Sequence, residues 1–231
     1  MIELYALNIE EIIDHTKYDF FMKCISDSKR EQIGKFHYIS DKKRSLYADV
    51  LVRYLICQKF NITNSSIKFH TNVYGKPYYS DNAEFYFSIA HSNKWIFLGV
   101  SNNEIGVDIE YISDCRLDIA KHFFTTEEYE DLISTLVPYR SKLFYDIWCL
   151  KESYAKYRGI GLSIKLDSFK TKIIKDSSMI FTNYDEKIYV KHYAVDPNYS
   201  AAACSIEQPP NMINFIKLDK ICKYMNLRTF L

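Results

Sequence analysis

The sequence lacks the features that mark several large classes of protein. No uninterrupted apolar run approaches the roughly 18 residues that a membrane-spanning helix needs, so we expect no membrane span. Residues 1–11 carry acidic side chains where a signal peptide would have a basic segment followed by an apolar one. The chain has no Walker-type loop, no Gly-x-Ser-x-Gly motif and no dinucleotide-binding fingerprint. These absences argue against a membrane-spanning chain, a Walker-type or dinucleotide-binding protein and a Gly-x-Ser-x-Gly hydrolase.

Excess charge and paired cysteines are also missing. The chain has 30 Lys and Arg residues against 29 Asp and Glu residues, a net charge of +1, whereas nucleic-acid-binding proteins usually carry excess positive charge. Its six cysteines form no Cys-x-x-Cys pair and share no zinc-ligand spacing with histidines. We therefore expect no nucleic-acid partner and reduced thiols in a cytoplasmic protein. Cys57 and Cys149 lie among apolar residues and are expected to be buried.

What the sequence does contain is ordinary globular composition. Of its 231 residues, 48% are hydrophobic and 26% charged, enough for one large domain or two small ones. Hydrophobic periodicity predicts a helix over 45–60 followed by a strand pair within 84–100. The same order recurs as a helix over 144–158 followed by a strand pair within 187–206. This repetition predicts an α+β fold of two similar halves, residues 1–105 and 106–231; a single mixed domain is the alternative.

Two carboxylates are expected side by side on a strand that begins at Ile105. Asp108 and Glu110 are two residues apart, so both side chains point to one face of that strand. Two acids on one face repel each other unless a cation lies between them, and Mg²⁺ prefers oxygen ligands. The pattern is compatible with a metal site, and the alternative is a solvent-facing pair at the end of the strand.

A second group lies on the helix predicted at 144–158. Trp148, Glu152 and Lys156 are spaced by four residues and therefore share one helix face. An exposed Glu–Lys ion pair, worth only ~0.3–0.5 kcal/mol, is the simpler interpretation. However, apolar neighbours such as Leu150 and Tyr154 indicate a mostly buried helix, in which a glutamate needs a partner. A metal ion shared with the two acids would supply that partner.

Phosphate-binding groups are the third constellation. The turn at 74–77 presents Lys76 beside Pro77, and His91-Ser92 lies at the end of a predicted strand. For His91 the alternative is an ordinary surface histidine. Further basic residues could add phosphate contacts or simply form a solvated helix face; they are Lys29, Arg30, Lys35, Lys42, Lys43 and Arg44.

The order of these pieces resembles one protein family. Gly75-Lys76-Pro77 is followed by Phe87-Ser-Ile-Ala-His91-Ser, by Gly106-Val-Asp108-Ile-Glu110, and by Trp148-Cys-Leu-Lys-Glu152-Ser-Tyr-Ala-Lys156. The Gly-x-Asp-x-Glu and Trp-x-x-Lys-Glu-x-x-x-Lys blocks, about 40 residues apart, are specific when taken together. Over most of its length the chain resembles the 4′-phosphopantetheinyl transferases of the surfactin-synthetase-activating type.

This resemblance implies a fold and a reaction. The fold would be two pseudo-symmetric α+β halves in one monomer, with the active site between them. The reaction would move the 4′-phosphopantetheine arm of coenzyme A onto a serine of an apo peptidyl or acyl carrier protein. It would release adenosine 3′,5′-bisphosphate and activate synthases of nonribosomal peptides, polyketides or fatty acids.

The resemblance also implies roles for particular residues. Asp108, Glu110 and Glu152 would hold Mg²⁺, with Mn²⁺ as the alternative ion, and Glu152 would also be the general base for the carrier serine. Coenzyme A would be bound in three places: its phosphate oxygens by Lys156, His91 and Ser92, its adenine beside Lys76 and Pro77, and its 3′-phosphate by Lys29 and Arg44.

Two departures and two alternative functions accompany the resemblance. Family members often have Ser where this chain has Ala90, and a basic residue near Gln32, which puts single phosphate contacts in doubt. The segment 111–124 resembles the family's carrier-docking segment, and its apolar residues either seat a carrier helix or complete the core; they are Ile112, Leu117, Ile119, Phe123 and Phe124. The alternatives are a non-catalytic coenzyme A or nucleotide-phosphate binding module, and a Mg²⁺-dependent phosphohydrolase that needs no carrier.

Overall fold

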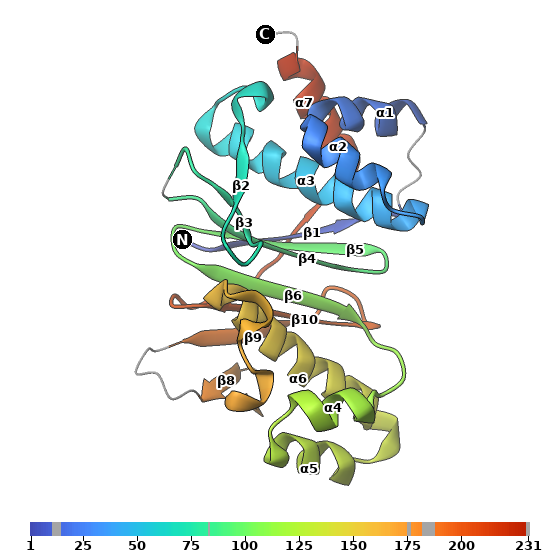
Figure 1. Ribbon diagram of the computed structural model, residues 1–231, viewed down its shortest axis with the longest axis vertical. Coiled ribbons are helices and arrows are strands. Elements are labelled where there is room, and N and C mark those ends of the chain that lie inside the picture. The colour runs from blue at the N-terminus through green and yellow to red at the C-terminus, as the bar shows by residue number, and fades with distance from the viewer. Residues whose placement is uncertain (11–14, 83, 175–176, 182–187, 230–231) are drawn as a thin grey trace.

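The computed structural model describes residues 1–10, 15–82, 84–174, 177–181 and 188–229, and it arranges them in four layers (Figure 1). Two sheets face each other in the middle, and helices cover the outer side of each sheet. The elements of the first half are β1 (Glu3–Asn8), α1 (His15–Cys24), α2 (Asp27–Gly34), α3 (Ile39–Phe60), β2 (Phe69–Thr71), β3 (Pro77–Tyr79), β4 (Tyr86–Ser92) and β5 (Trp95–Ser101).

The rest of the chain builds the second half and then returns. Its elements are β6 (Ile105–Tyr111), α4 (Leu117–Phe123), α5 (Thr126–Ser134), α6 (Val137–Arg158), β7 (Lys170–Ile174), β8 (Ser177–Phe181), β9 (Tyr189–Tyr193), β10 (Tyr199–Ser205), β11 (Asn214–Ile216) and α7 (Leu218–Thr229). The last two elements belong to the first half in space, since β11 pairs with β1 and α7 packs against α3.

Both halves repeat one topology. The first sheet has the order β11-β1-β5-β4 and the second β6-β10-β9-β8-β7. In each, the entering strand pairs antiparallel with the last strand of a hairpin, as β1 does with β5 and β6 with β10. Each sheet is covered by one 22-residue helix, α3 or α6. The predicted α+β fold of two similar halves is therefore confirmed, while the division at residue 105 stays a prediction.

The two halves share an apolar core between their sheets. Side chains of the first sheet, such as Leu4 and Phe97, pack there against Val107, Ile109 and Ala201 of the second, and all five are at most 1% exposed. Burying apolar surface between the sheets is the main force that holds the halves together. A site between them is therefore formed on a rigid support.

Strands β4 and β6 join the sheets through serine side chains. The Ser88 hydroxyl accepts a hydrogen bond from the backbone N–H of Val107 at 3.1 Å, and the Ser92 hydroxyl accepts one from Tyr111 at 3.0 Å. Both contacts join residues 19 apart, so the strands run in the same direction. Hydroxyl oxygens thus satisfy edge N–H groups that would otherwise lack a partner.

The close approach of β6 to α6 requires a glycine at residue 106. A β-carbon at this position would lie 1.9 Å from the carbonyl oxygen of Ser153 and 2.2 Å from the backbone nitrogen of Tyr157. No side chain fits there, so the helix backbone can rest directly on the strand. The first residue of the Gly-x-Asp-x-Glu motif is explained by this contact.

Several predicted boundaries differ from the structure. Helix α3 begins at Ile39, six residues earlier than the predicted helix over 45–60, and no side chain caps its first turn. Helix α6 begins at Val137, seven residues earlier than predicted, because Pro138 suits a first helical turn. Two short helices, α4 and α5, precede α6, and Thr125 and Glu128 form the capping box that starts α5. The predicted strand 187–195 appears as β9, and residue 187 lies outside the described residues.

Two other expectations concern membranes and cysteines. Within the described ranges, no helix combines the length and apolarity needed to cross a bilayer. Cys57 and Cys149 are buried in the core, as predicted, with 1% and 0% of their surface exposed.

Replacing Gly106 by alanine tests the contact between β6 and α6. The added methyl group would force the strand from the helix, and we expect Gly106→Ala to lower the free energy of unfolding by about 2 kcal/mol or more. Urea denaturation followed by circular dichroism measures this. Gly34→Ala is the matched control, because a β-carbon at Gly34 meets no atom within 4 Å. Equal stability of the two variants would contradict the role given to Gly106.

Candidate functional site

Asp108 is at the centre of a charged cluster between β6 and α6. Its side chain is 5% exposed, and one carboxylate oxygen accepts a hydrogen bond from the Lys156 ammonium at 2.6 Å. The other oxygen, Oδ2, is buried and has no hydrogen-bond partner among the described residues. A buried carboxylate oxygen without a donor is costly. The cluster therefore has one open acceptor position suited to a cation.

The remaining two acids lie around Asp108. Glu110 accepts a hydrogen bond from the Ser92 hydroxyl at 2.8 Å. Burial and the charge of Asp108 raise the pKa of Glu110 to about 7. Burial and the same charge also raise the pKa of Glu152. Both carboxyl groups have a raised pKa because too little water and too little positive charge surround their ionised forms.

Lys156 supplies part of the missing positive charge. Burial lowers the pKa of its ammonium group, but the Coulombic attraction and hydrogen bond of Asp108 outweigh this effect and the pKa stands above its ordinary value. The lysine is therefore charged at neutral pH. One ammonium does not balance three carboxylates, so the site still favours binding a second cation.

The donor set suits a divalent cation such as Mg²⁺. Carboxylate oxygens are the ligands this ion prefers, and Asp108 offers an oxygen to which no described residue donates a hydrogen bond. Throughout the described part of the chain, however, no three acidic, histidine or cysteine side chains already surround a common metal position. Asp108 instead faces Lys156. The residues thus fit a metal ion chemically, and the geometry of coordination is not fixed by the protein alone.

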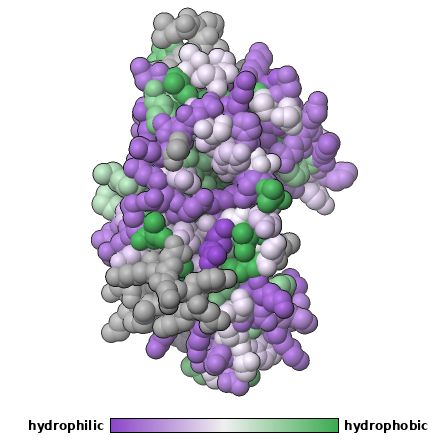
Figure 2. All heavy atoms as spheres, turned by 60° about the vertical axis from the view of Figure 1, so that its left-hand side comes forward, coloured by the Kyte–Doolittle hydropathy of each residue, from purple (hydrophilic) through white to green (hydrophobic). Residues whose placement is uncertain are grey.

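A cavity of about 310 Å³ adjoins this cluster and lies between the halves. Its walls include Lys76 and Pro77 from the first half, and Glu152 and Lys156 from the second. A larger groove of about 960 Å³ runs over the first half and shares Pro77 with the cavity, along with Phe87 and Ile89. Figure 2 shows a mostly hydrophilic surface with scattered apolar side chains on the face that it draws, outside the atoms drawn in grey. An elongated, charged ligand could occupy both spaces at once.

Of the residues predicted to bind phosphate in the first half, some line the larger groove and others make contacts within the protein. Lys29 and His91 line the larger groove. Burial lowers the pKa of Lys29; desolvation and then the charges of Arg44 and Lys156 lower that of His91. Arg44 instead pairs with Asp41 and donates to the carbonyl of Asn93 at 3.0 Å. It lines neither cavity, and Ser92 faces Glu110 rather than open space.

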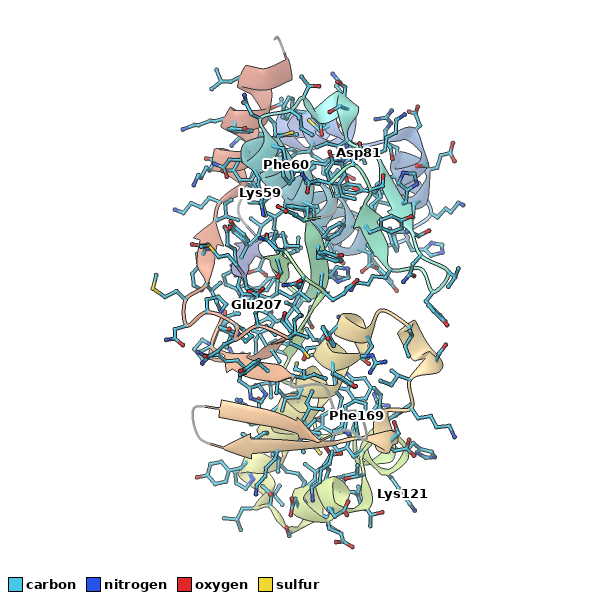
Figure 3. The ribbon with its side chains drawn as sticks, turned by 90° about the vertical axis from the view of Figure 1, so that its left-hand side faces the viewer. Lys59, Phe60, Asp81, Lys121, Phe169 and Glu207 are labelled. Atoms are coloured by element: carbon cyan, nitrogen blue, oxygen red, sulfur yellow. The ribbon has the colours of Figure 1, made fainter. Side chains whose placement is uncertain are left out.

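The lysine of the Trp-x-x-Lys-Glu block received no predicted role, and the structure gives it one. Lys151 is fully buried and forms an ion pair of 2.8 Å with Glu128, which is 2% exposed. The ammonium also donates to the carbonyls of Leu166 and Phe169 at 2.7 and 2.8 Å. Figure 3 labels Phe169 in the lower half of the molecule. All three ammonium protons are thus satisfied.

Glu128 extends this contact to a third element. One of its oxygens accepts hydrogen bonds from the backbone and hydroxyl of Thr171, at 2.6 and 2.7 Å, and the other caps the start of α5 at Thr125. The ion pair therefore ties α5 and the beginning of β7 to α6, one residue before Glu152. Glu128 and Lys151 are 23 residues apart in the sequence, and no local pattern indicates their pairing.

The segment 111–124 has both buried and exposed apolar residues. Phe124 is 4% exposed and belongs to the core under α4 and α5, whereas Phe123 is 43% exposed. The Phe123 ring stands edge-on to Trp148 at 5.9 Å. Ile112, Leu117 and Ile119 are half-buried. Docking of a carrier on this segment stays a prediction.

An acid-and-lysine cluster beside a cavity between two similar halves is suited to a transferase that acts on phosphate groups. Comparison with known proteins shows which family the chain belongs to. The family model "4′-phosphopantetheinyl transferase, N-terminal" matches residues 14–103, and the model "4′-phosphopantetheinyl transferase superfamily" matches residues 104–204. 4′-Phosphopantetheinyl transferase Sfp of Bacillus subtilis (strain 168) is 36% identical over 205 residues, covering 88% of this chain and 92% of that protein. The chain belongs to the 4′-phosphopantetheinyl transferase superfamily.

Two further relatives show the extent of the similarity. 4′-Phosphopantetheinyl transferase gsp of Aneurinibacillus migulanus is 30% identical over 233 residues, covering 100% of this chain and 98% of that protein. A holo-(acyl-carrier-protein) synthase from Bacillus anthracis, solved with CoA (3′,5′-ADP), is 15% identical with a TM-score of 0.39. It covers 44% of this chain and 92% of that chain. The family assignment rests on the sequence relatives, since this structural likeness is low.

The pair formed by Glu128 and Lys151 can be tested by removing one charge. In Glu128→Gln the buried ammonium loses its counter-charge, and breaking such a pair costs about 3 kcal/mol or more of unfolding free energy. Urea denaturation measures the loss. Glu127→Gln, on the same helical turn but exposed, is the control and should change stability by less than about 1 kcal/mol. Similar losses in both variants would argue against the buried pair.

Proposed function

We propose that this chain transfers the 4′-phosphopantetheine arm of coenzyme A to a serine hydroxyl of an apo carrier protein. The observation that carries this proposal is the cavity between the halves, which places Lys76 and Pro77 opposite Glu152 and Lys156. One wall offers a turn that can hold the nucleotide, and the other offers acids and an ammonium for the pyrophosphate. Membership of the 4′-phosphopantetheinyl transferase superfamily supports the same reaction.

Asp108, Glu110 and Glu152 are the proposed ligands of a magnesium ion. Oδ2 of Asp108, which has no hydrogen-bond partner in the described part of the chain, and the raised pKa values of the two glutamates support this assignment. When bound, the ion would neutralise charge on the pyrophosphate of coenzyme A. Mn²⁺ also accepts oxygen ligands and is the alternative ion.

Glu152 is the proposed general base for the carrier serine. Its raised pKa makes its carboxylate a better proton acceptor than an ordinary glutamate. The serine oxygen would form a bond to the β-phosphorus as the bond from that phosphorus to the bridging oxygen breaks. The proton leaves the serine for Glu152, and the electron pair leaves with adenosine 3′,5′-bisphosphate.

Lys156 and the residues of the larger groove would hold the phosphate oxygens. The Lys156 ammonium is charged and half-buried beside Asp108, so it can donate to the pyrophosphate where charge develops. Lys29 and His91 line the groove where the 3′-phosphate would lie, and Lys76 and Pro77 lie where the adenine would. For Arg44 this role requires that the guanidinium leave Asp41 and the carbonyl of Asn93.

The proposal also covers partners and location. The partner would be an apo peptidyl or acyl carrier protein that docks on residues 111–124, where Phe123 is exposed. We further propose that the chain acts as a monomer, because both walls of the cavity come from one chain, and that it works in the cytoplasm, where its six cysteines would stay reduced.

The direct test is the intact mass of an apo peptidyl carrier protein after incubation with this protein, coenzyme A and Mg²⁺. A gain of one phosphopantetheine group that a chelator abolishes would support the proposal, and apo acyl carrier protein is the second substrate to try. Coenzyme A binding without mass gain on either carrier would favour a binding module. Cleavage of coenzyme A without any carrier would favour a phosphohydrolase.

Single substitutions test the acid cluster. We expect Asp108→Asn and Glu152→Gln to lower the rate of carrier loading at least ~100-fold, since each removes a charged group from the proposed metal site or base. Circular dichroism should show both variants folded. Glu84→Gln removes an exposed acid outside the two cavities and is the control. Near-normal turnover in either site variant would contradict the assignment.

A further inference from the structure

The loop between β2 and β3 reaches from the first half to the end of α6 in the second. Figures 1 and 3 both show this connection extending toward the segment that follows α6. Most of the loop is exposed, but Asn72 and Lys76 are half-buried. Exposed loops are usually mobile unless something anchors them. The anchor here is the carboxamide of Asn72.

Asn72 forms hydrogen bonds in two directions. Its Oδ1 accepts from the backbone N–H groups of Tyr74 and Lys76, each at 2.9 Å, which fixes the turn of the loop. Its Nδ2 donates to the carbonyl oxygen of Gly159 at 2.8 Å. Gly159 follows the last residue of α6 and caps the helix. The Asn72 side chain therefore joins the turn in the first half to α6 in the second.

The end of α6 is shaped to receive the loop. Gly159 has a φ of +63°, in the left-handed region that favours glycine. A β-carbon there would lie 3.1 Å from Cδ of Lys76 and 3.7 Å from Nδ2 of Asn72. The loop therefore rests on the helix end at van der Waals distance, with no space for another side chain.

The same contact fixes Lys76, which lines the cavity opposite Glu152. The Lys76 ammonium pairs with Glu104 at 2.5 Å and donates to the carbonyl of Ile105 at 3.4 Å. Ile105 begins β6, the strand that carries Asp108. The loop thus contacts the end of α6 through Asn72 and the start of β6 through Lys76, and these two elements carry the acid cluster.

We infer that Asn72 is a positioning residue: by binding Gly159 it sets the distance between the turn that carries Lys76 and the end of α6. This inference rests on the proposed function, in which the cavity between these walls binds coenzyme A. Asn72 lines neither the 310 Å³ cavity nor the larger groove, so its effect on substrate binding would pass through Lys76 and Pro77.

Two substitutions at Asn72 separate its two hydrogen-bonding directions. Asn72→Asp keeps an acceptor for the N–H groups of Tyr74 and Lys76 but turns an oxygen toward the carbonyl of Gly159. Asn72→Ala removes the hydrogen bonds within the turn and the hydrogen bond to Gly159. We expect both variants to raise KM for coenzyme A roughly tenfold, with kcat changed less than about twofold, because binding is weakened and the acid cluster is untouched. Steady-state loading of an apo carrier protein measures both constants, and calorimetric titration with coenzyme A measures Kd directly.

The controls show whether Asn72 acts through Lys76. Asn8→Asp is the matched variant, because Asn8 caps a turn at Glu10 in the same way but lies outside both cavities; its KM should be unchanged. In a Lys76→Ala background, Asn72→Ala should raise KM further by less than about twofold, since residues that act as a unit are not additive.

Three results would overturn the inference. The first is an unchanged KM for coenzyme A in both Asn72 variants. The second is a KM that rises in Asn72→Ala and stays unchanged in Asn72→Asp, which would mean that Asn72 shapes only its own turn. The third is a full tenfold effect in the Lys76→Ala background. Loading of the carrier by the unsubstituted protein tests the proposed function separately, so failure of the inference and failure of the function are distinguishable.

Discussion

The direct contact of helix α6 with strand β6 is the constraint on which the site depends. Gly106 allows the helix backbone to touch the strand, since a β-carbon there would lie 1.9 Å from a carbonyl oxygen. The close packing of the helix on the strand brings the Lys156 ammonium within 2.6 Å of a carboxylate oxygen of Asp108. A wider gap would leave Asp108 buried without its only ion-pair partner among the described residues. The glycine and the two charged residues of the motifs are thus parts of one packing arrangement.

Around this contact the molecule combines tight packing with unbalanced charge. Lys151 and Glu128 form a buried pair in which every ammonium proton has a partner, and this pair fixes the helix immediately before Glu152. At the site itself, three carboxylates face one ammonium, and one oxygen of Asp108 has no donor among the residues that the structure describes. The protein thus satisfies the charges that support the helix and leaves unsatisfied those that would meet a metal and a pyrophosphate.

Sequence patterns predicted local features better than contacts between distant segments. Spacing placed Asp108 beside Glu110, and Glu152 beside Lys156, because strand and helix periods are fixed by backbone geometry. The return of β11 and α7 to the first half, and the pairing of Lys151 with Glu128, depend on tertiary packing that no local pattern encodes. Likewise, nothing near Arg44 in the sequence indicated its contact with the carbonyl of Asn93, 49 residues away.

Titration of Mn²⁺ by electron paramagnetic resonance, in the presence of coenzyme A, tests most directly whether the β6–α6 contact builds a cation site. Mn²⁺ takes the same oxygen ligands as Mg²⁺ and is visible by this method. The account predicts one bound ion per chain, with binding lost in Asp108→Asn. Mn²⁺ that stays free while coenzyme A is bound, or that binds equally to Asp108→Asn, would contradict it.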